Sequence, residues 1–462
     1  MYAYFAFVAL KGHYPDLPAS PQSTPWPLVP PDDLPCTVAD QGTLDAGRGI
    51  YAETLEAARQ HADECDGHVY LVAPLPGARV AVGESSWRAE AAVCFGRLTE
   101  ENAPQIAQHV LETYMSGVPQ IWDVLCWAIE QMSDAWWEGA APIVLEKLIA
   151  LGCGKALYIA GQRTPIRVHD VLQALVKSGD PASLYLAGRD WPDGRFDRAI
   201  AHALAETGEA KHLYLAGRDW PTDRFDDDIT KALVKARDAV YLYLAGRDWP
   251  DGRYCEAIAE ALIATGNAEY LYRAGEDWPE GRFCEAISQA LVKAGDARYL
   301  YLAGRDWPDE RFSMKIGEAL VENKDAYYFL YLAGCDWSER RFSEAITQAL
   351  VEVADAQCLY FAGNDWPEQR FSRKIVDALV KTRNAEYLYY AGKDWPDERY
   401  DAVIAQALIE TKDAKHLYLA GRSWPDGRFD ERIAQALFQT WNPEYLALAN
   451  RDWPRRRFSY GG

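Results

Sequence analysis

One unit of 29 residues is repeated along most of this chain, and its tryptophan marks the period. The unit at 296–324 begins Asp-Ala-Arg-Tyr-Leu-Tyr-Leu-Ala-Gly-Arg-Asp-Trp-Pro, and the pattern starts again at 325. Eight of the nine intervals between the ten tryptophans are 29 residues, and one is 30. A fixed period between 20 and 50 residues is typical of repeat architectures. The marker residues are Trp191, Trp220, Trp249, Trp278, Trp307, Trp337, Trp366, Trp395, Trp424 and Trp453.

Each unit is predicted to contain two helices, of which the first opens at Asp or Asn. These residues are preferred N-caps because their short side chains accept hydrogen bonds from the first free backbone N–H groups. The helix body, as in 300–304, is almost wholly apolar, which is typical of a helix buried between neighbours. The predicted caps are Asp180, Asp238, Asn267, Asp296, Asp325, Asp355, Asn384, Asp413 and Asn442.

The second helix is predicted to follow the Asp-Trp-Pro segment. Asp306 would cap it, with Asp309 three residues later, as in a capping box. Phe312, Ile316 and Leu320 then fall on one side of a helix. One such pair of helices cannot bury its own apolar face, so successive pairs should stack into a solenoid.

The helix-pair period over residues 104–458 resembles the αα-solenoid class, which includes HEAT and TPR repeats. The TPR and ankyrin signatures are absent, and 29 residues is shorter than either unit. The phrase Gly-Asp-Ala-x-Tyr-Leu-Tyr-Leu-Ala-Gly-x-Asp-Trp is also similar to tandem repeats of bacterial and phage proteins, a similarity that implies no function. The predicted fold is mainly α, a right-handed or superhelical αα-solenoid of about ten units, preceded by a small α+β domain.

Three domains are predicted: a small α+β domain at 1–100, a helical cap of degenerate repeats at 101–179, and the tandem repeats at 180–462. The terminal units of a solenoid are usually atypical because they cover an apolar end. In the first domain we expect a helix at 52–65 and strands at 2–10, 68–73, 78–83 and 87–98. In the cap we expect helices at 104–115, 120–132, 142–151, 156–161 and 169–178.

Charge and composition exclude some classes of function. The net charge is −21, of which residues 1–150 contribute −13 and the remainder −8. A chain this acidic repels nucleic-acid phosphates, so no direct nucleic-acid binding is expected. No run of 18 apolar residues occurs, so no membrane span is expected. Nine scattered cysteines without a CxxC motif indicate reduced thiols and a cytoplasmic protein.

The Asp-Trp pair and the arginine four residues after it recur in nearly every unit. The favoured interpretation is a structural ladder, in which arginine and aspartate bond between successive units and the tryptophan is buried. The alternative is a column of guanidinium groups that binds an acidic or phosphorylated ligand. The central members of this predicted ladder are Asp248, Trp249, Arg253, Asp277, Trp278, Arg282, Asp306, Trp307 and Arg311.

The residue after the unit's glycine is polar, mostly basic and variable, so it is a candidate for reading an acidic partner. The alternative is a solvated charge near the negative end of a helix dipole. A tyrosine four residues earlier recurs as well, either in the core or lining a binding groove, since aromatic residues are enriched in binding hot spots. The candidate partner-binding residues are Arg189, Arg218, Arg247, Arg305, Lys393, Arg422, Tyr243, Tyr272 and Tyr301.

The favoured function is a non-enzymatic scaffold that binds a protein or peptide along the solenoid surface. One alternative is an enzymatic or ligand-binding activity in the first domain, with the solenoid as its recognition arm. Others are an acidic mimic of nucleic acid and a self-assembling structural protein. The chain has no P-loop, GxGxxG, GxSxG or HExxH motif, so no catalytic residue, cofactor or metal site is predicted. The sequence leaves the oligomeric state open.

Overall fold

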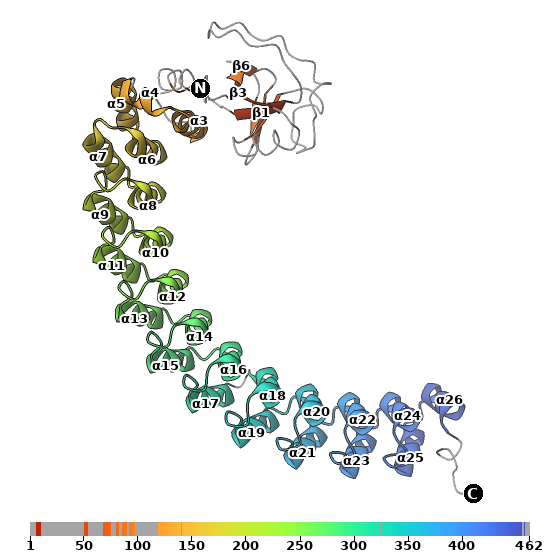
Figure 1. The fold of residues 1–462 in the computed structure, drawn as a ribbon. Helices are drawn as coiled ribbons and strands as arrows, with labels where there is room; N and C mark the ends of the chain where they lie inside the picture. Colours follow the sequence, from red (N-terminus) through yellow and green to blue (C-terminus); the bar gives the residue numbers. More distant parts are fainter. Residues whose placement is uncertain are drawn as a thin grey trace. The chain divides into compact units, whose positions relative to one another are not determined.

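The structure is a computed structural model that describes mainly residues 119–454 (Figure 1). It describes residues 6–10, 50–53, 68–74, 80–82, 86–89, 92–97, 103, 107, 119–139, 141–323, 325–454 and 457. The chain forms two compact units, 1–236 and 237–462. The three domains predicted from the sequence, at 1–100, 101–179 and 180–462, divide the chain differently and remain predictions.

The first unit contains helices that pack in successive pairs. Helices α6, α8 and α10 stack on one another in one row, and α5, α7, α9 and α11 stack in a second row beside it (Figure 1). The sequence did not predict α4. The helices are α3 Pro119–Glu130, α4 Asp134–Gly139, α5 Ala141–Leu151, α6 Gly154–Arg163, α7 Val168–Ser178, α8 Pro181–Asp190, α9 Arg198–Thr207, α10 Ala210–Asp219 and α11 Asp227–Ala236.

The second unit repeats this arrangement. Its even-numbered helices are the first helices of the repeats and stack in what we call the even row, and its odd-numbered helices form the odd row (Figure 1). The tandem helical repeat predicted from the period is therefore confirmed. The helices are α12 Ala239–Asp248, α13 Glu256–Thr265, α14 Ala268–Asp277, α15 Glu285–Ala294, α16 Ala297–Asp306, α17 Met314–Glu322, α18 Tyr327–Asp336, α19 Glu344–Val353, α20 Ala356–Asp365, α21 Arg373–Thr382, α22 Ala385–Asp394, α23 Ala402–Thr411, α24 Ala414–Ser423, α25 Glu431–Gln439 and α26 Pro443–Asp452.

The predicted caps hold at the start of most even-numbered helices. The Asp296 side chain, for example, accepts from the backbone N–H of Arg298 at 3.0 Å and of Tyr299 at 3.3 Å. The prediction is wrong at Asp325. Helix α18 has Ala326 at its N-cap position, because the repeat that contains Asp325 is one residue longer than the others.

The predicted start of the second helix is also wrong. Asp306 is the last residue of α16, and α17 begins only at Met314, with the Ser313 side chain accepting from the backbone of Lys315. The intervening residues form a tight turn in which the N–H of Arg311 bonds to the carbonyl of Pro308 at 3.0 Å. The Trp-Pro segment therefore ends one helix rather than opening the next.

Six strands of the first unit form an antiparallel sheet with the order β4-β5-β2-β1-β3-β6. The strand predicted at 87–98 is two strands, and β2 replaces the start of the helix predicted at 52–65. The remainder of that helix lies outside the described residues, as does most of the helix predicted at 104–115. The strands are β1 Ala6–Leu10, β2 Ile50–Glu53, β3 His68–Pro74, β4 Val80–Val82, β5 Ser86–Ala89 and β6 Ala92–Arg97.

Candidate partner-binding surface

We call the buried contacts that join successive repeats the frame. Its first contact is a tryptophan whose ring packs on the glycine of the preceding repeat. Trp307 is 1% exposed, and its indole N–H donates to the carbonyl of Tyr272 at 2.9 Å. A Cβ on Gly275 would lie 2.1 Å from the Trp307 ring, so only glycine fits beneath it. The same contact joins Gly161 to Trp191, Gly188 to Trp220, Gly246 to Trp278, Gly304 to Trp337, Gly334 to Trp366, Gly363 to Trp395, Gly392 to Trp424 and Gly421 to Trp453.

The recurring arginine after each tryptophan belongs to the same frame. Arg282 is 8% exposed and donates to the carbonyls of Gly246 at 2.8 Å and Trp249 at 2.6 Å in the preceding repeat. Its guanidinium also bonds to Asp251 at 2.5 Å and lies 4.9 Å from the centre of the Tyr254 ring. This arginine therefore joins successive repeats mainly through backbone carbonyls.

The aspartate of this inter-repeat contact differs from the predicted one. We expected the aspartate before the tryptophan, such as Asp248 or Asp277, to pair with this arginine. Arg282 instead bonds to Asp251, which follows the Trp-Pro turn of the preceding repeat. Arg311 likewise donates to the carbonyls of Gly275 at 2.8 Å and of Trp278 at 2.7 Å.

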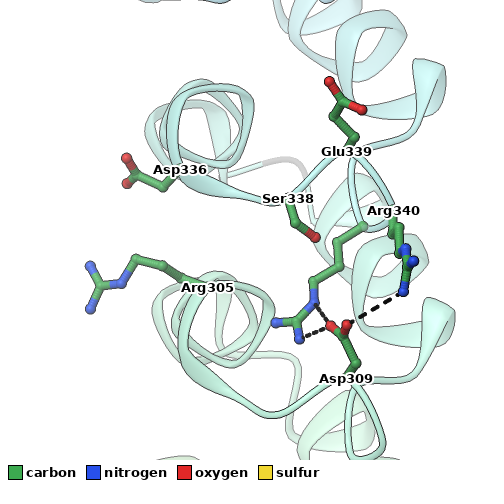
Figure 2. A pocket seen from close by; sticks show the side chains of 7 residues that line it. Arg305, Asp309, Asp336, Ser338, Glu339 and Arg340 are labelled. Atoms are coloured by element: carbon green, nitrogen blue, oxygen red, sulfur yellow. Dashed lines mark hydrogen bonds and ion pairs between the residues drawn. The ribbon is translucent and has the colours of Figure 1, made fainter.

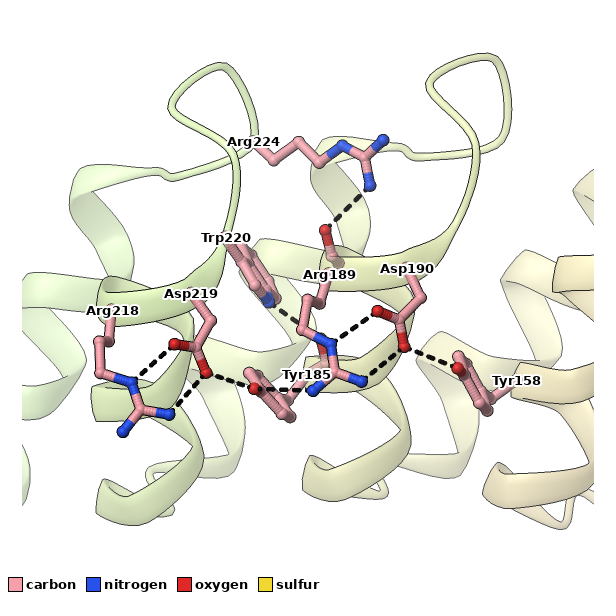
Figure 3. Close-up of polar contacts among 9 residues, drawn as sticks. Tyr158, Tyr185, Arg189, Asp190, Arg218, Asp219, Trp220 and Arg224 are labelled. Carbon is pink, nitrogen blue, oxygen red and sulfur yellow. Dashed lines mark hydrogen bonds and ion pairs between the residues drawn. The ribbon is translucent and has the colours of Figure 1, made fainter.

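The aspartate before the tryptophan serves a second, more exposed contact (Figure 3). Asp190 accepts from the guanidinium of Arg189 at 2.6 and 2.8 Å, and from the hydroxyl of Tyr158 in the preceding repeat at 2.7 Å. Arg189 also donates to the Tyr185 hydroxyl at 3.3 Å and lies 5.4 Å from the centre of that ring. The bond from Arg189, assisted by that from Tyr158, lowers the pKa of Asp190.

We call this contact the arginine clamp: the arginine after the glycine bonds the next aspartate and covers the tyrosine four residues before it. In the second unit, Arg305 bonds Asp306 at 2.7 and 3.0 Å and lies 5.5 Å from the centre of the Tyr301 ring. Burial and a hydrogen bond to Asp336 raise the pKa of Tyr301 to about 12. The same clamp is formed by Arg189, Arg218 and Arg247.

The structure places the predicted binding residues in two groups. The arginines of the clamps are exposed, whereas Tyr243, Tyr272 and Tyr301 are 2%, 9% and 4% exposed, with their hydroxyls bonded to aspartates of the next repeat. Lys393 makes a single 3.5 Å ion pair with Asp394, and Arg422 is exposed beside Ser423. Partner binding by any of these residues remains a prediction.

The arginine clamp is missing from several helices of the second unit, an interruption that the sequence analysis did not predict. Glu276, Cys335 and Asn364 occupy the arginine position of α14, α18 and α20. The following aspartates of these helices are exposed, whereas the clamped aspartates are partly buried. The sequence signal was the replacement itself, and in α20 it is accompanied by Phe361, at a position where most repeats have leucine.

A hollow of about 520 Å³ adjoins the interrupted clamp of α18 (Figure 2). It lies where Ser338 replaces the proline of other repeats. Arg341 and Arg340 both face Asp309, at whose carboxylate Arg340 makes a 3.9 Å ion pair. Every residue that lines it has a polar or charged side chain: Arg305, Asp309, Asp336, Ser338, Glu339, Arg340 and Arg341.

No protein-family model matches the chain, and a comparison with curated proteins gives no match. In the part of the chain that the structure describes, no helix is both long and apolar enough to cross a membrane. The fold by itself places the described repeats in the class of helical tandem-repeat proteins. Function therefore has to be argued from the surface of the repeats.

Proposed function

We propose that the protein is a non-enzymatic scaffold that binds a protein or peptide partner along its even row, in the cytoplasm. The supporting observation is that the repeats combine a constant buried frame with variable exposed positions. The frame contacts, made by residues such as Trp307, Gly275 and Arg282, recur from repeat to repeat. A row of identical supports that presents different side chains is suited to recognition of an extended partner.

Exposed positions of the even-numbered helices change from repeat to repeat. The second residue of each even-numbered helix is exposed or half-exposed and is different in most repeats, being apolar, acidic, basic, amide or aromatic. One turn further along, the sixth residue is usually leucine, as at Leu302, which is half-exposed. The second-residue column reads Ala182, Lys211, Val240, Glu269, Arg298, Tyr328, Gln357, Glu386, Lys415 and Glu444.

The alternatives receive less support from the geometry. A nucleic-acid mimic needs rows of uncompensated carboxylates, but several aspartates before the tryptophans, such as Asp190 and Asp306, are paired with the arginine of their clamp. An activity in residues 1–100 would depend on side chains that lie outside the described residues. Six cysteines are free thiols, which fits the proposed cytoplasmic location: Cys126, Cys153, Cys255, Cys284, Cys335 and Cys358.

The experiment that tests this function is site-specific photo-crosslinking with the full chain. A photoreactive residue at Leu302 samples the even row, and one at Glu318, which is exposed on α17, samples the odd row as the matched control. We expect Leu302 to crosslink a specific protein from host-cell lysate and Glu318 to crosslink little. The proposal fails if neither position gives a specific product, or if only Glu318 does.

A further inference from the structure

We propose that α18 and α20 present two adjacent docking sites for arginine side chains of the partner. The proposal rests on the scaffold function above and names both its site and the chemistry of its partner. Its basis is that the chain supplies its own arginine to the same site in other repeats. In α18 and α20 that arginine is replaced by Cys335 and Asn364, so the partner would supply the guanidinium.

The clamped repeats show how a guanidinium fits this site. In α12, Arg247 bonds Asp248 through two nitrogens at 2.7 and 3.1 Å. The same guanidinium donates to the Tyr243 hydroxyl at 3.2 Å and lies 5.4 Å from the centre of that ring. The site thus consists of a carboxylate that accepts a two-nitrogen fork and an aromatic ring beneath it, both of which suit arginine.

The same receiving groups are present without their arginine in α18 and α20. Among the residues that the structure describes, no arginine or lysine forms an ion pair with Asp336 or Asp365, and both carboxylates are exposed. Asp365 accepts from the Tyr331 hydroxyl at 2.6 Å and from the Asn364 amide at 2.7 Å, so its orientation is fixed before any partner arrives. Tyr331 and Tyr360 are only half-buried, whereas the clamped tyrosines are buried.

Additional aromatic rings surround the two sites and extend the surface that a cation can contact. The ring centre of Tyr331 lies 6.2 Å from that of Tyr328, which is 52% exposed, and 5.8 Å from that of Phe361. Tyr360 lies 5.2 Å from Phe361 and 5.8 Å from Tyr390. Aromatic rings beside unpaired carboxylates form a surface that attracts cations through both ring faces and charge.

The chemistry favours arginine over lysine and an extended segment over a folded one. A guanidinium can bond a carboxylate through two nitrogens while it stacks on a ring, whereas an ammonium is a compact and strongly hydrated charge. Packed helices lie ~8–10 Å apart, and an extended chain advances ~3.3 Å per residue. Two arginines about two or three residues apart in an extended peptide would therefore reach Asp336 and Asp365 together.

The test uses the full chain and short fluorescent peptides of glycine and serine that carry two arginines three residues apart. Binding is measured by fluorescence anisotropy, with peptides in which lysine or glutamine replaces both arginines. The double substitution Cys335→Arg and Asn364→Arg restores the clamp found in other repeats. The matched control is Ala264→Arg with Ala294→Arg, which adds the same charge at exposed positions of the odd row.

We expect the arginine peptide to bind about tenfold more tightly than the lysine peptide, and the clamp-restoring variant to weaken its binding about tenfold or more. The odd-row variant should change binding less than about threefold, since it alters only the general field of the protein. Equal loss in both variants, equal binding of both cationic peptides, or no binding of the arginine peptide would overturn the proposal. If the photoreactive residue at position 302 still crosslinks a partner in that case, the scaffold function is retained and only the proposed arginine-docking sites are rejected.

Discussion

Replacing Gly275 by alanine should disrupt the contact between two repeats, although alanine ordinarily favours a helix. The added methyl group would lie 2.1 Å from Cε2 and Cζ2 of Trp307, and 2.7 Å from its Nε1. The ring is enclosed on all sides, at 1% exposure, so it cannot move aside within the existing packing. Either the helices separate or the indole leaves its site.

The expected loss of stability follows from three contributions. Forcing an extra methyl into a packed core costs ~1–3 kcal/mol. Displacing the indole also breaks its hydrogen bond to Tyr272 and leaves buried polar groups unsatisfied, which costs ~1–3 kcal/mol. The helix propensity of alanine offsets ~1 kcal/mol. The net destabilisation of Gly275→Ala should be about 3 kcal/mol, close to the ~3–5 kcal/mol expected for removing the ring in Trp307→Ala.

Urea denaturation followed by far-ultraviolet circular dichroism measures this difference. Gly281 is the matched control in the same repeat, because a Cβ there meets nothing within 4 Å. Gly281→Ala should leave stability unchanged or raise it slightly, by ~0.4–1 kcal/mol, since alanine restricts the unfolded chain. If the two variants agree within about 0.5 kcal/mol, the tryptophan is not locked on the glycine and the reasoning is refuted.

Two further predictions concern pH and a helix end. Burial raises the pKa of Tyr254 and Tyr400 to about 12, and burial together with the bond to Asp336 raises that of Tyr301 to about 12. The folded state thus favours the neutral phenols. Their contribution to stability is complete below pH ~10, the pKa in the unfolded chain, and is lost as the pH rises through 12. In an alkaline titration, the last part of the tyrosinate absorbance should therefore appear together with the loss of helix; ionisation of every tyrosine with the helix intact would contradict the prediction. Ala354 ends α19 with φ 55°, so Ala354→Gly should stabilise the protein by ~0.5–1 kcal/mol in urea denaturation.

Features that depend on a single repeat could be predicted from the sequence. The period, the caps at residues such as Asp296, and the apolar side of the second helix all follow from local spacing. Ile316 and Leu320 are fully buried, as their helical spacing predicted. The glycine that ends α13 also has the left-handed backbone typical of a helix end, with φ 66° at Gly266.

Features that depend on contacts between repeats could not be predicted in the same way. The partner of Arg282 depends on how far each repeat is displaced relative to the preceding one. The spacing of residues within a repeat gives no information about that displacement. That displacement brings Asp251, rather than an aspartate before a tryptophan, to the guanidinium. The cap of α18 failed for a related reason, because one inserted residue leaves Asp325 ahead of the N-cap position.

Each repeat therefore contains two arginine positions with different energetic weight, and this difference explains where the repeats vary. Loss of Arg282 would leave two buried carbonyls without their donor, which should destabilise the protein by ~1–3 kcal/mol. Loss of an exposed clamp arginine such as Arg247 removes only a surface ion pair, which contributes ~0–1 kcal/mol to stability. Position 282 and its equivalents are arginine in every repeat, while the clamp position also holds Glu276, Cys335 and Asn364. Because stability scarcely depends on the clamp, its position can change to suit a partner while the frame stays intact. The surface most able to acquire specificity is thus the one where the clamp is interrupted.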